Sequence, residues 1–558
     1  MHLMGRPTRI AILCDQAAPP GVRALLPALA AFVITLVGCT PAPVSPTAGP
    51  LPKPSAARVL VVPTAMPTLW PSPTAEPEEF DLVERELSQE GPWLVGAGAG
   101  EVIVVNLDGT GRTVLLGPPL WEPEQDIVDG YGVSSSGWIA ARTGLPNDWD
   151  TGEHEVAANA IPASEVGIAI WRLPERMPVR FISRFSDELL NGMQEIRDFE
   201  LPFGWQATGP RWKHEMVFLS LLHPDARLAW SPNGRYLAFA AALDGPSADV
   251  YVYDTLGDEV RRLTNGPNQA VLLGWSPDSR WILHYEANTY AISHGEIVGL
   301  RAEALWSVTA DGSQVRQLGD GEGNIPWISG WLSPSIAVLT SWKGGSSLPS
   351  QLWSLDLDTG ARLERQDLSF YSVAADPASD VIAVNADSLN DPEGTYREGG
   401  LFVLRMSDAE PRRAGSDEQS SCAGCLVEWS EKLGLFTLSS PSYMEPPETP
   451  VSFLPSGEIA NRYEGEVSRP IVSPDGNWLA FSGQGIRIYD SQEMRVNVPG
   501  GEVRELVWSA DSSRVFYLEE QAGRLALMAV SAPEGTPTLL RPDIQLHGMH
   551  WVQAGGQD

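Results

Sequence analysis

The sequence predicts an all-β protein: a single β-propeller of four-stranded blades, with a ring closed by pairing of the C-terminal strand with the first blade. Three observations lead to this prediction. A short phrase recurs as WSPNGRYLAFA (230–240), WSPDSRWILHYEA (275–287) and VSPDGNWLAF (472–481). Further strand-like segments follow each copy at similar spacing, and each end of the repeat region carries an incomplete copy. Small antiparallel sheets repeated in this way are typical of propellers.

The N-terminus has the pattern of an export signal. Arginines precede an apolar run over residues 24–38, which is too short to span a bilayer comfortably and suits a signal-peptide core. Leu36-Val37-Gly38-Cys39 resembles the lipobox of bacterial lipoproteins, which implies that Cys39 becomes lipidated. We therefore expect a lipoprotein signal peptide over 1–38. An ordinary signal peptide with a chance cysteine is the alternative, and translation could begin near Val22.

A spacer is expected between this cysteine and the folded body. Residues 40–80 contain eleven prolines among Thr, Ala and Ser, and proline blocks both helices and sheet ladders. We therefore predict that 39–80 comprises the lipidated cysteine and an extended tether, and that 81–558 forms the propeller.

The charge of the chain restricts its partners. The formal net charge is −33, so nucleic acid and anionic lipid headgroups should be repelled. We expect contact with a membrane through the N-terminal lipid alone, a protein, peptide or cell-wall partner, no nucleic acid, no cofactor and a monomeric body.

Residues 228–264 show how one repeat should fold. LAW, RYLAFAA, DVYVYD and EVRRLT are strand segments, and Ser-Pro-Asn-Gly is a tight turn between the first two. Pro232 sets its own φ, Asn233 tolerates the bridge region and Gly234 accepts a positive φ. Further copies lie at 131–183, 273–318, 330–364, 371–413, 426–461, 470–498 and 506–540.

These repeats resemble the TolB-type, WD-repeat-like β-propeller family. The resemblance is carried by Trp230-Ser-Pro-Asn-Gly, Trp275-Ser-Pro-Asp-Ser and Val472-Ser-Pro-Asp-Gly, and it covers about 130 to 552. It implies the architecture and no activity. TolB has an α/β domain where this chain has a proline-rich stretch, so TolB's own partners are not implied. Prolyl-oligopeptidase-like enzymes also contain such propellers, and this chain would correspond to the propeller without the enzyme.

The first blade is expected to borrow a strand from the other end of the chain. Residues 93–116 match 478–498 but lack the innermost strand, and HGMHWV at 547–552 has the pattern of that strand. Pairing the two would remove an exposed sheet edge. Nine patterns result, and we predict eight or nine blades within a range of seven to nine.

Several motifs that suggest chemistry have simpler explanations. The run Gly96–Gly100 is followed by a strand rather than the helix that a dinucleotide loop needs, so a hairpin is expected. The repeat serines lack a G-x-S-x-G context. Asp356, Asp358 and Gly360 fit a turn better than a calcium loop; we predict no metal. Cys422 and Cys425 are expected to form a disulfide, with free thiols or a redox or metal role as alternatives.

Function is expected where the repeat is interrupted. Connections between first and second, and between third and fourth, strands are short. The others are long, at 143–166, 184–227, 287–303, 341–350, 387–399 and 440–450. One face should therefore be trimmed and the other decorated, with an amphipathic helix at 186–199. The decorated loops also carry Trp205 and Trp212. The proposed ligand-binding residues are Asp148, Trp149, Asp150, His154, Tyr290, Trp342, Tyr396 and Tyr443.

Three functional hypotheses follow. The first is a lipid-tethered, non-enzymatic scaffold in the cell envelope that binds its ligand through the decorated face. The second is an extracytoplasmic hydrolase or lyase that uses Asp148, Asp150, His154 and Glu155 as acids and bases. The third is a purely structural component of the envelope. Convergence of these four side chains in one pocket would favour the enzyme.

Overall fold

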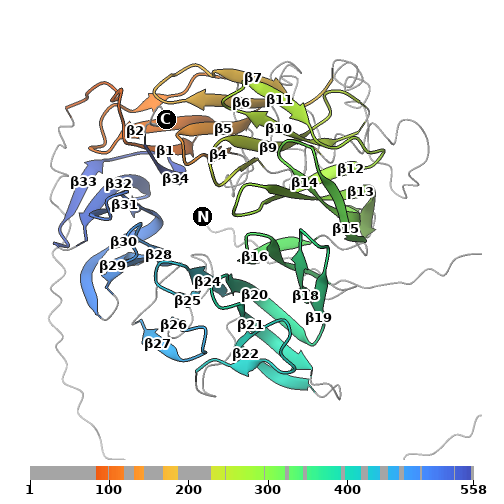
Figure 1. Ribbon diagram of the computed structural model, residues 1–558. Helices are drawn as coiled ribbons and strands as arrows, with labels where there is room; N and C mark the ends of the chain where they lie inside the picture. The colour runs from red at the N-terminus through yellow and green to blue at the C-terminus, as the bar shows by residue number, and fades with distance from the viewer. Residues whose placement is uncertain are drawn as a thin grey trace, which may run out of the picture. The chain divides into compact units, whose positions relative to one another are not determined.

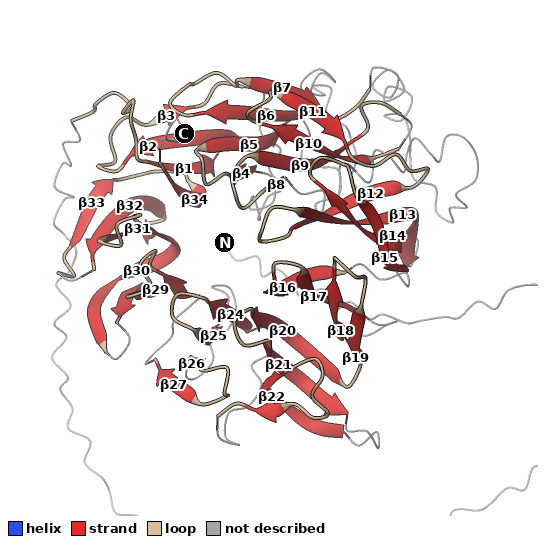
Figure 2. Ribbon diagram, viewed as in Figure 1, coloured by secondary structure: helices blue, strands red, loops and turns tan. Residues whose placement is uncertain are grey.

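The computed structural model describes residues 83–98, 100–117, 131–143, 167–186, 221, 228–245, 247–293, 296–320, 326–342, 349–390, 396–415, 425–439, 450–463, 470–490, 493–532 and 534–553. All 34 secondary-structure elements in these residues are β-strands, joined by loops (Figure 2). The predicted all-β class is therefore confirmed. The predicted signal peptide and tether, and all but Ser186 of the expected helix at 186–199, lie outside the described residues.

Six antiparallel sheets contain four strands each in chain order, as the repeat predicts. The first three consist of β4 (Tyr131–Val133), β5 (Trp138–Thr143), β6 (Gly167–Arg172) and β7 (Arg180–Ser183); β8 (Ala229–Trp230), β9 (Tyr236–Ala241), β10 (Asp249–Asp254) and β11 (Glu259–Arg262); and β12 (Gln269–Trp275), β13 (Trp281–Ser293), β14 (Glu296–Thr309) and β15 (Val315–Asp320). The next three consist of β16 (Trp327–Ser333), β17 (Ile336–Trp342), β18 (Pro349–Asp356) and β19 (Arg362–Arg365); β20 (Leu368–Asp376), β21 (Val381–Asn390), β22 (Tyr396–Leu404) and β23 (Arg412–Arg413); and β24 (Leu426–Ser430), β25 (Leu435–Ser439), β26 (Val451–Phe453) and β27 (Ile459–Arg462).

A seventh four-stranded sheet combines the two ends of the repeat region. It contains β1 (Trp93–Gly98), β2 (Glu101–Asn106), β3 (Thr113–Val114) and β34 (His547–Val552), in the order β3-β2-β1-β34. Trp93 pairs with Val552 and Leu94 with Trp551 in antiparallel register. The C-terminal strand therefore occupies the position next to β1 that the incomplete copies predict.

The last sheet has six strands and contains two copies of the repeat. Its strands are β28 (Pro470–Val472), β29 (Leu479–Tyr489), β30 (Met494–Trp508), β31 (Arg514–Gln521), β32 (Arg524–Ser531) and β33 (Pro537–Arg541). The first part of β30 pairs with β29 at Val496–Val498, and the second part pairs with β31 at Val503–Trp508. One continuous strand thus joins two sheets that the sequence predicts as separate.

Apolar side chains are buried between consecutive sheets. For example, the β8–β11 sheet packs on the β4–β7 sheet through one cluster that includes Phe239 and Ile170, and on the β12–β15 sheet through another that includes Val250 and Ile282. Each strand alternates its side chains between these two interfaces. Figure 1 shows the sheets following one another in chain order around a common centre, as in a propeller.

Parts of three predicted long loops are instead extensions of strands. Strands β13 and β14 stay paired as far as Ser293 and Glu296, and β21 and β22 as far as Asn390 and Tyr396. Strands β17 and β18 pair up to Trp342 and Pro349. The expected loops at 287–303 and 387–399 are therefore wrong in large part, because the backbone in these segments satisfies its hydrogen bonds by continued pairing. Of the expected loop at 341–350, the two residues at each end belong to strands, and 343–348 lie outside the described residues.

His284 on β13 should make the fold sensitive to acid. Its side chain is 1% exposed, and neither ring nitrogen has a hydrogen-bond partner in the described part of the chain. Burial lowers the pKa of His284 from 6.5 to about 3, so the unfolded chain takes up this proton first as the pH falls. The contribution of His284 to the free energy of unfolding is therefore fully present above pH 6.5. It is lost progressively below that pH, by about 2–3 kcal/mol at pH 4.5. Urea unfolding of wild type and His284→Phe at both pH values measures this difference. Identical losses in both proteins would contradict it.

Candidate functional site

The structure describes the backbone at three of the eight proposed ligand-binding residues. Tyr290 lies in β13, Trp342 ends β17 and Tyr396 begins β22. These strands belong to three consecutive sheets, and the three residues lie toward the ends of those sheets that are opposite the repeat turns. Asp148, Trp149, Asp150, His154 and Tyr443, together with Glu155, Trp205, Trp212 and Cys39, lie outside the described residues.

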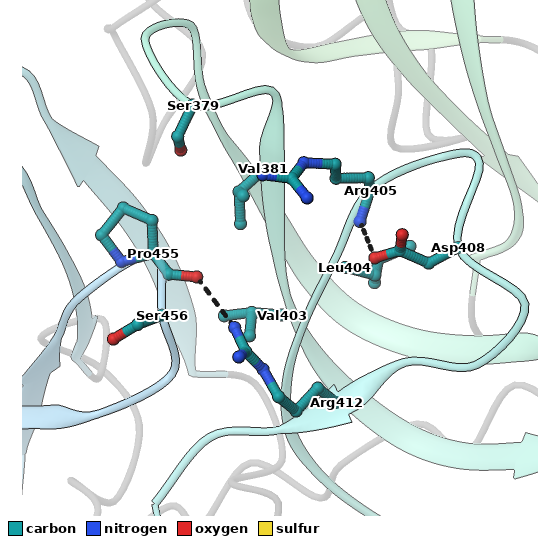
Figure 3. Close-up of a pocket in the computed structure, with 9 residues that line it drawn as sticks. All are labelled: Ser379, Val381, Val403, Leu404, Arg405, Asp408, Arg412, Pro455 and Ser456. Carbon is teal, nitrogen blue, oxygen red and sulfur yellow. Dashed lines mark hydrogen bonds between the residues drawn. The ribbon is translucent and has the colours of Figure 1, made fainter.

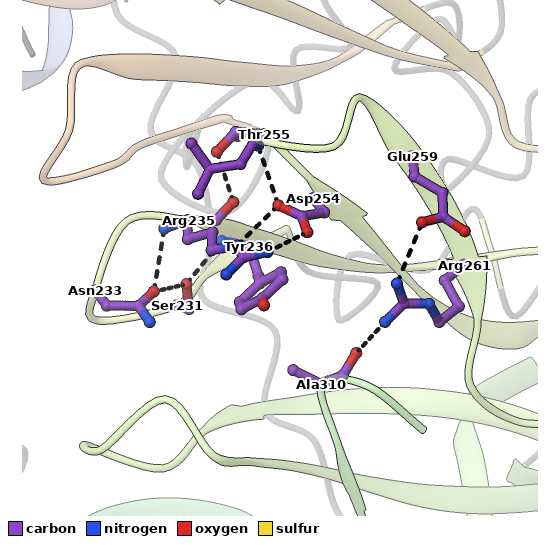
Figure 4. Close-up of polar contacts among 10 residues, drawn as sticks. Ser231, Asn233, Arg235, Tyr236, Asp254, Thr255, Glu259, Arg261 and Ala310 are labelled. Atoms are coloured by element: carbon purple, nitrogen blue, oxygen red, sulfur yellow. Dashed lines mark hydrogen bonds and ion pairs between the residues drawn. The ribbon is translucent and has the colours of Figure 1, made fainter. Parts of the chain in front are cut away.

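The repeated phrase is a hydrogen-bonded turn. Ser231 Oγ donates to Asn233 Oδ1 at 2.7 Å and accepts the backbone N–H of Tyr236 at 2.9 Å (Figure 4). Ser276, Ser473 and Ser509 make the same pair of bonds to an aspartate two residues later and an amide five residues later. Each serine hydroxyl thus closes its own turn, as expected of side chains that stabilise tight turns. The repeated phrase therefore has a structural role.

Turns of neighbouring copies of the repeat are also joined directly. Asn233 N–H donates to Ser279 Oγ at 3.0 Å, and Asp475 N–H donates to Ser512 Oγ at 2.9 Å. Ser279 and Ser512 have φ values of 61° and 60°, at the position where the other copies have Gly234 and Gly476. A non-glycine residue in this region is uncommon, and here its hydroxyl links one repeat to the one before it.

The tryptophan of the phrase links neighbouring copies of the repeat as well. The indole N–H groups of Trp230, Trp275 and Trp508 donate to the carbonyl oxygens of Gly132, Ala229 and Ile471 at 3.1, 2.8 and 2.9 Å. Each acceptor belongs to the first strand of the preceding copy of the repeat. The abundance of tryptophan in the phrase therefore reflects contacts between copies of the repeat.

Carboxylates beside the turns are held in their charged form. The hydroxyl of Thr309, with the amide and hydroxyl of Ser313, lowers the pKa of Asp311 to about 2. A bidentate ion pair with Arg235, at 2.9 and 2.7 Å, lowers the pKa of Asp254. These acids are acceptors in turns, and their low pKa values do not suit a general acid or base near neutral pH.

The other motifs fall where the sequence predicts turns. Gly98 pairs with Glu101 in the β1–β2 hairpin, which confirms the hairpin interpretation of Gly96–Gly100. Asp356 Oδ1 accepts the amides of Asp358 and Thr359, at 2.8 and 3.2 Å. Among the described residues no group of three His, Cys, Asp or Glu side chains could hold a metal ion.

Cys425 is buried and disulfide-bonded. Cys422, its predicted partner, lies outside the described residues.

A pocket of about 470 Å³ lies on the face of the short turns. It is formed by the β20–β21, β22–β23 and β26–β27 turns, so it bridges two sheets (Figure 3). Its lining residues are Ser379, Val381, Val403, Leu404, Arg405, Asp408, Arg412, Pro455 and Ser456. The candidate residues proposed from the sequence were all expected on the opposite face, and this pocket was not predicted. The available signal for this pocket in the sequence was the group of arginines in RMSDAEPRR (405–413), within an acidic chain.

Comparison with known proteins gives remote similarities. No protein-family model matches the chain. A stretch of 69 residues is 39% identical to the uncharacterized peptidase YuxL of Bacillus subtilis (strain 168), and it covers 12% of this chain and 10% of that protein. The match therefore spans about a tenth of the peptidase.

The solved structures that match share little sequence with this chain. A eukaryotic initiation factor is 11% identical with a TM-score of 0.48, over 84% of this chain and 99% of that chain. Dipeptidyl peptidase 4 of Porphyromonas gingivalis is 10% identical with a TM-score of 0.43, over 75% and 60%. TolB from Acinetobacter baumannii is 15% identical with a TM-score of 0.26, over 55% and 79%. Similarity this remote bears on neither activity nor partners.

In the described residues no helix has the length and apolar character needed to cross a bilayer.

Proposed function

We propose that this protein is a non-enzymatic, lipid-anchored scaffold of the bacterial cell envelope that binds a protein, peptide or envelope component. The observation that carries the proposal is the long β13–β14 hairpin, which runs past the pairing with β12 at Ala287 as far as Ser293 and Glu296. Beside it, β17–β18 and β21–β22 end only one or two residues beyond their pairing with β16 and β20. Paired strands that project in this way offer a preorganised binding surface, which lowers the entropic cost of association.

We further propose that the body is a closed ring of nine blades, with the six-stranded sheet supplying two of them. Nine apolar clusters formed by the described residues support this count, because each joins consecutive copies of the repeat. The last of them, which contains Phe516 and Leu94, joins the final copy to the first sheet. Side chains from both neighbouring copies also contact β34. The Glu505 carboxylate accepts the amides of Gly548 and Met549 at 2.8 and 2.7 Å, and the Tyr131 hydroxyl donates to the Gly548 carbonyl.

In the proposed mechanism, the ring presents its hairpins to a ligand. Cys39 would carry the lipid and residues 40–80 would hold the ring away from the membrane, at up to about 3 Å per residue if extended. The projecting hairpins would then meet a ligand beyond the membrane surface. The acidic body favours this arrangement, because it is repelled by anionic headgroups.

Site-specific photo-crosslinking in intact cells tests the binding face. A photoreactive residue replaces Tyr290 or Trp342 on the hairpins, and the matched control replaces Leu256, which is 75% exposed in the β10–β11 turn on the opposite face. We expect a discrete adduct from the hairpin positions alone. An adduct from Leu256 alone would place the working face at the short turns, and the absence of any adduct would exclude a protein partner.

A hydrolase is the second candidate, because a 69-residue stretch matches a peptidase. Asp148, Asp150, His154 and Glu155 would supply the acids and bases. Cleavage of unstructured peptides by the full chain, lost in His154→Gln and in Asp150→Asn, would favour this candidate over the scaffold.

A further inference from the structure

The pocket on the short-turn face contains two guanidinium groups that the protein leaves largely unused. In Figure 3, Arg405 extends into it from one side toward Val381, and Arg412 from the other side toward Pro455. The Arg405 guanidinium has no partner in the described part of the chain. Arg412 makes one long hydrogen bond, 3.4 Å from Nη2 to the Pro455 carbonyl. Both side chains therefore retain donors for a ligand.

Several other arginines of this acidic protein are engaged by carboxylates. Arg365 makes a bidentate pair with Asp367 at 3.0 and 2.6 Å, and Arg262 contacts Asp249 at 2.6 Å. Asp408 is the one carboxylate that lines the pocket, and its Oδ2 accepts the backbone N–H of Arg405 at 2.8 Å. With two cations against one anion, the lining carries a net positive charge on a chain whose formal charge is −33.

The β22–β23 turn, which carries Arg405 and Asp408, is fixed by hydrogen bonds to its backbone. Arg365 Nη1 donates to the Asp408 carbonyl at 2.6 Å, and its side chain is only 7% exposed. The Arg405–Asp408 bond closes the turn internally. The two free donors are therefore presented by a fixed backbone, which reduces the entropy lost when a ligand binds.

The rest of the lining is suited to an amphipathic ligand. Val381, Val403 and Leu404 form an apolar floor, and Pro455 and Ser456 lie at the neighbouring sheet. The Ser456 hydroxyl accepts a 3.4 Å amide contact from Glu458 and can still donate its own proton. Planar guanidinium groups bind carboxylates through parallel N–H donors, and a volume of about 470 Å³ holds one or two amino-acid residues.

We propose that this pocket binds the carboxylate of a short peptide segment, with the guanidinium groups of Arg405 and Arg412 on the carboxylate and an apolar side chain on the floor. The site lies on the face opposite the extended hairpins, so it would give the protein a second ligand. It does not depend on the function proposed above.

Calorimetric titration of the full chain at low salt tests the site with three probes. These are N-acetyl-Gly-Leu with a free C-terminal carboxylate, its C-terminal amide, and N-acetyl-Glu-amide, which offers only a side-chain carboxylate. We expect binding of at least one free acid, no binding of the Gly-Leu amide, and weakening by about tenfold or more in Arg405→Met and in Arg412→Met. Arg514→Met is the matched control, because Arg514 is exposed beside another short turn and its guanidinium has no described partner.

Each result of this titration has its own interpretation. A preference for N-acetyl-Gly-Leu assigns the site to chain ends, and a preference for N-acetyl-Glu-amide assigns it to acidic side chains. Equal binding of acid and amide, equal affinity in the arginine variants, or no binding of either acid would overturn the proposal. Thermal unfolding of each variant checks that the fold is unchanged, as expected for exposed side chains.

Discussion

Removal of β34 by truncation after Leu546 is expected to destabilise the protein more than any single substitution considered above. Strand β1 would lose its partner along Trp93–Ala97, and the apolar contacts of Met549 and Val552, which are 7% and 2% exposed, would be lost. Burial of these two side chains alone contributes about 3–6 kcal/mol. The uncovered edge of β1 should also promote association between copies. Thermal unfolding and light scattering measure the two effects.

The matched control is truncation after Gln553, which keeps β34 intact and should unfold like wild type. A synthetic peptide covering residues 545–553 should restore part of the lost stability to the shorter protein. If truncation after Leu546 leaves the unfolding temperature unchanged, β34 does not hold the first and last copies together, and the closed ring proposed here is wrong.

Asp249→Ala is expected to cost about 3–5 kcal/mol of the free energy of unfolding. Asp249 is fully buried at the start of β10, where its carboxylate accepts bonds from Ser247, Thr264, Arg262 and the amide of Gly266 at 3.0, 2.7, 2.6 and 3.3 Å. Its loss would remove these four bonds, including the ion pair with a guanidinium whose side chain is 19% exposed. Urea unfolding gives the difference in free energy.

Glu259→Ala serves as the control because the Arg261–Glu259 pair is exposed, with side-chain exposures of 36% and 60%. Such pairs contribute between about 0 and 1 kcal/mol. Asp249→Asn keeps the shape and removes the charge, so it should fall between the two. Equal effects of Asp249→Ala and Glu259→Ala would show that the buried bonds contribute little beyond solvent-exposed ones.

The turns were predictable from sequence because their chemistry is local. Pro232 and Gly234 fix the backbone within four residues, and Gly234 has the positive φ, 72°, that the sequence predicts. Ser279 occupies the same position with φ 61° and was not predictable in this way. Its hydroxyl accepts a bond from Asn233 in the preceding sheet, and a partner 46 residues away leaves no local signal.

The strand extensions were missed for a related reason. The segment Pro499-Gly500-Gly501 has the composition of a turn, yet β30 runs through it. A Cβ on Gly500 would lie 2.3 Å from Glu519 Oε1, and the N–H of Gly501 donates to that same oxygen. These glycines make room for a neighbouring strand's side chain instead of ending a strand. The pocket at Arg405 and Arg412 was hidden in the same way, because it needs turns from two sheets.

The position of β1 has a mechanical consequence. It is the first strand of the described chain, and it pairs with β2 on one side and β34 on the other. Ahead of it, Glu84 binds Arg541 at 2.6 Å and Arg85 contacts Asp108 at 3.3 Å. A force applied at the N-terminal end would pull β1 along its own axis, in shear, and would have to break both ladders together. The protein should therefore resist tension applied at this end and then yield in a single abrupt step.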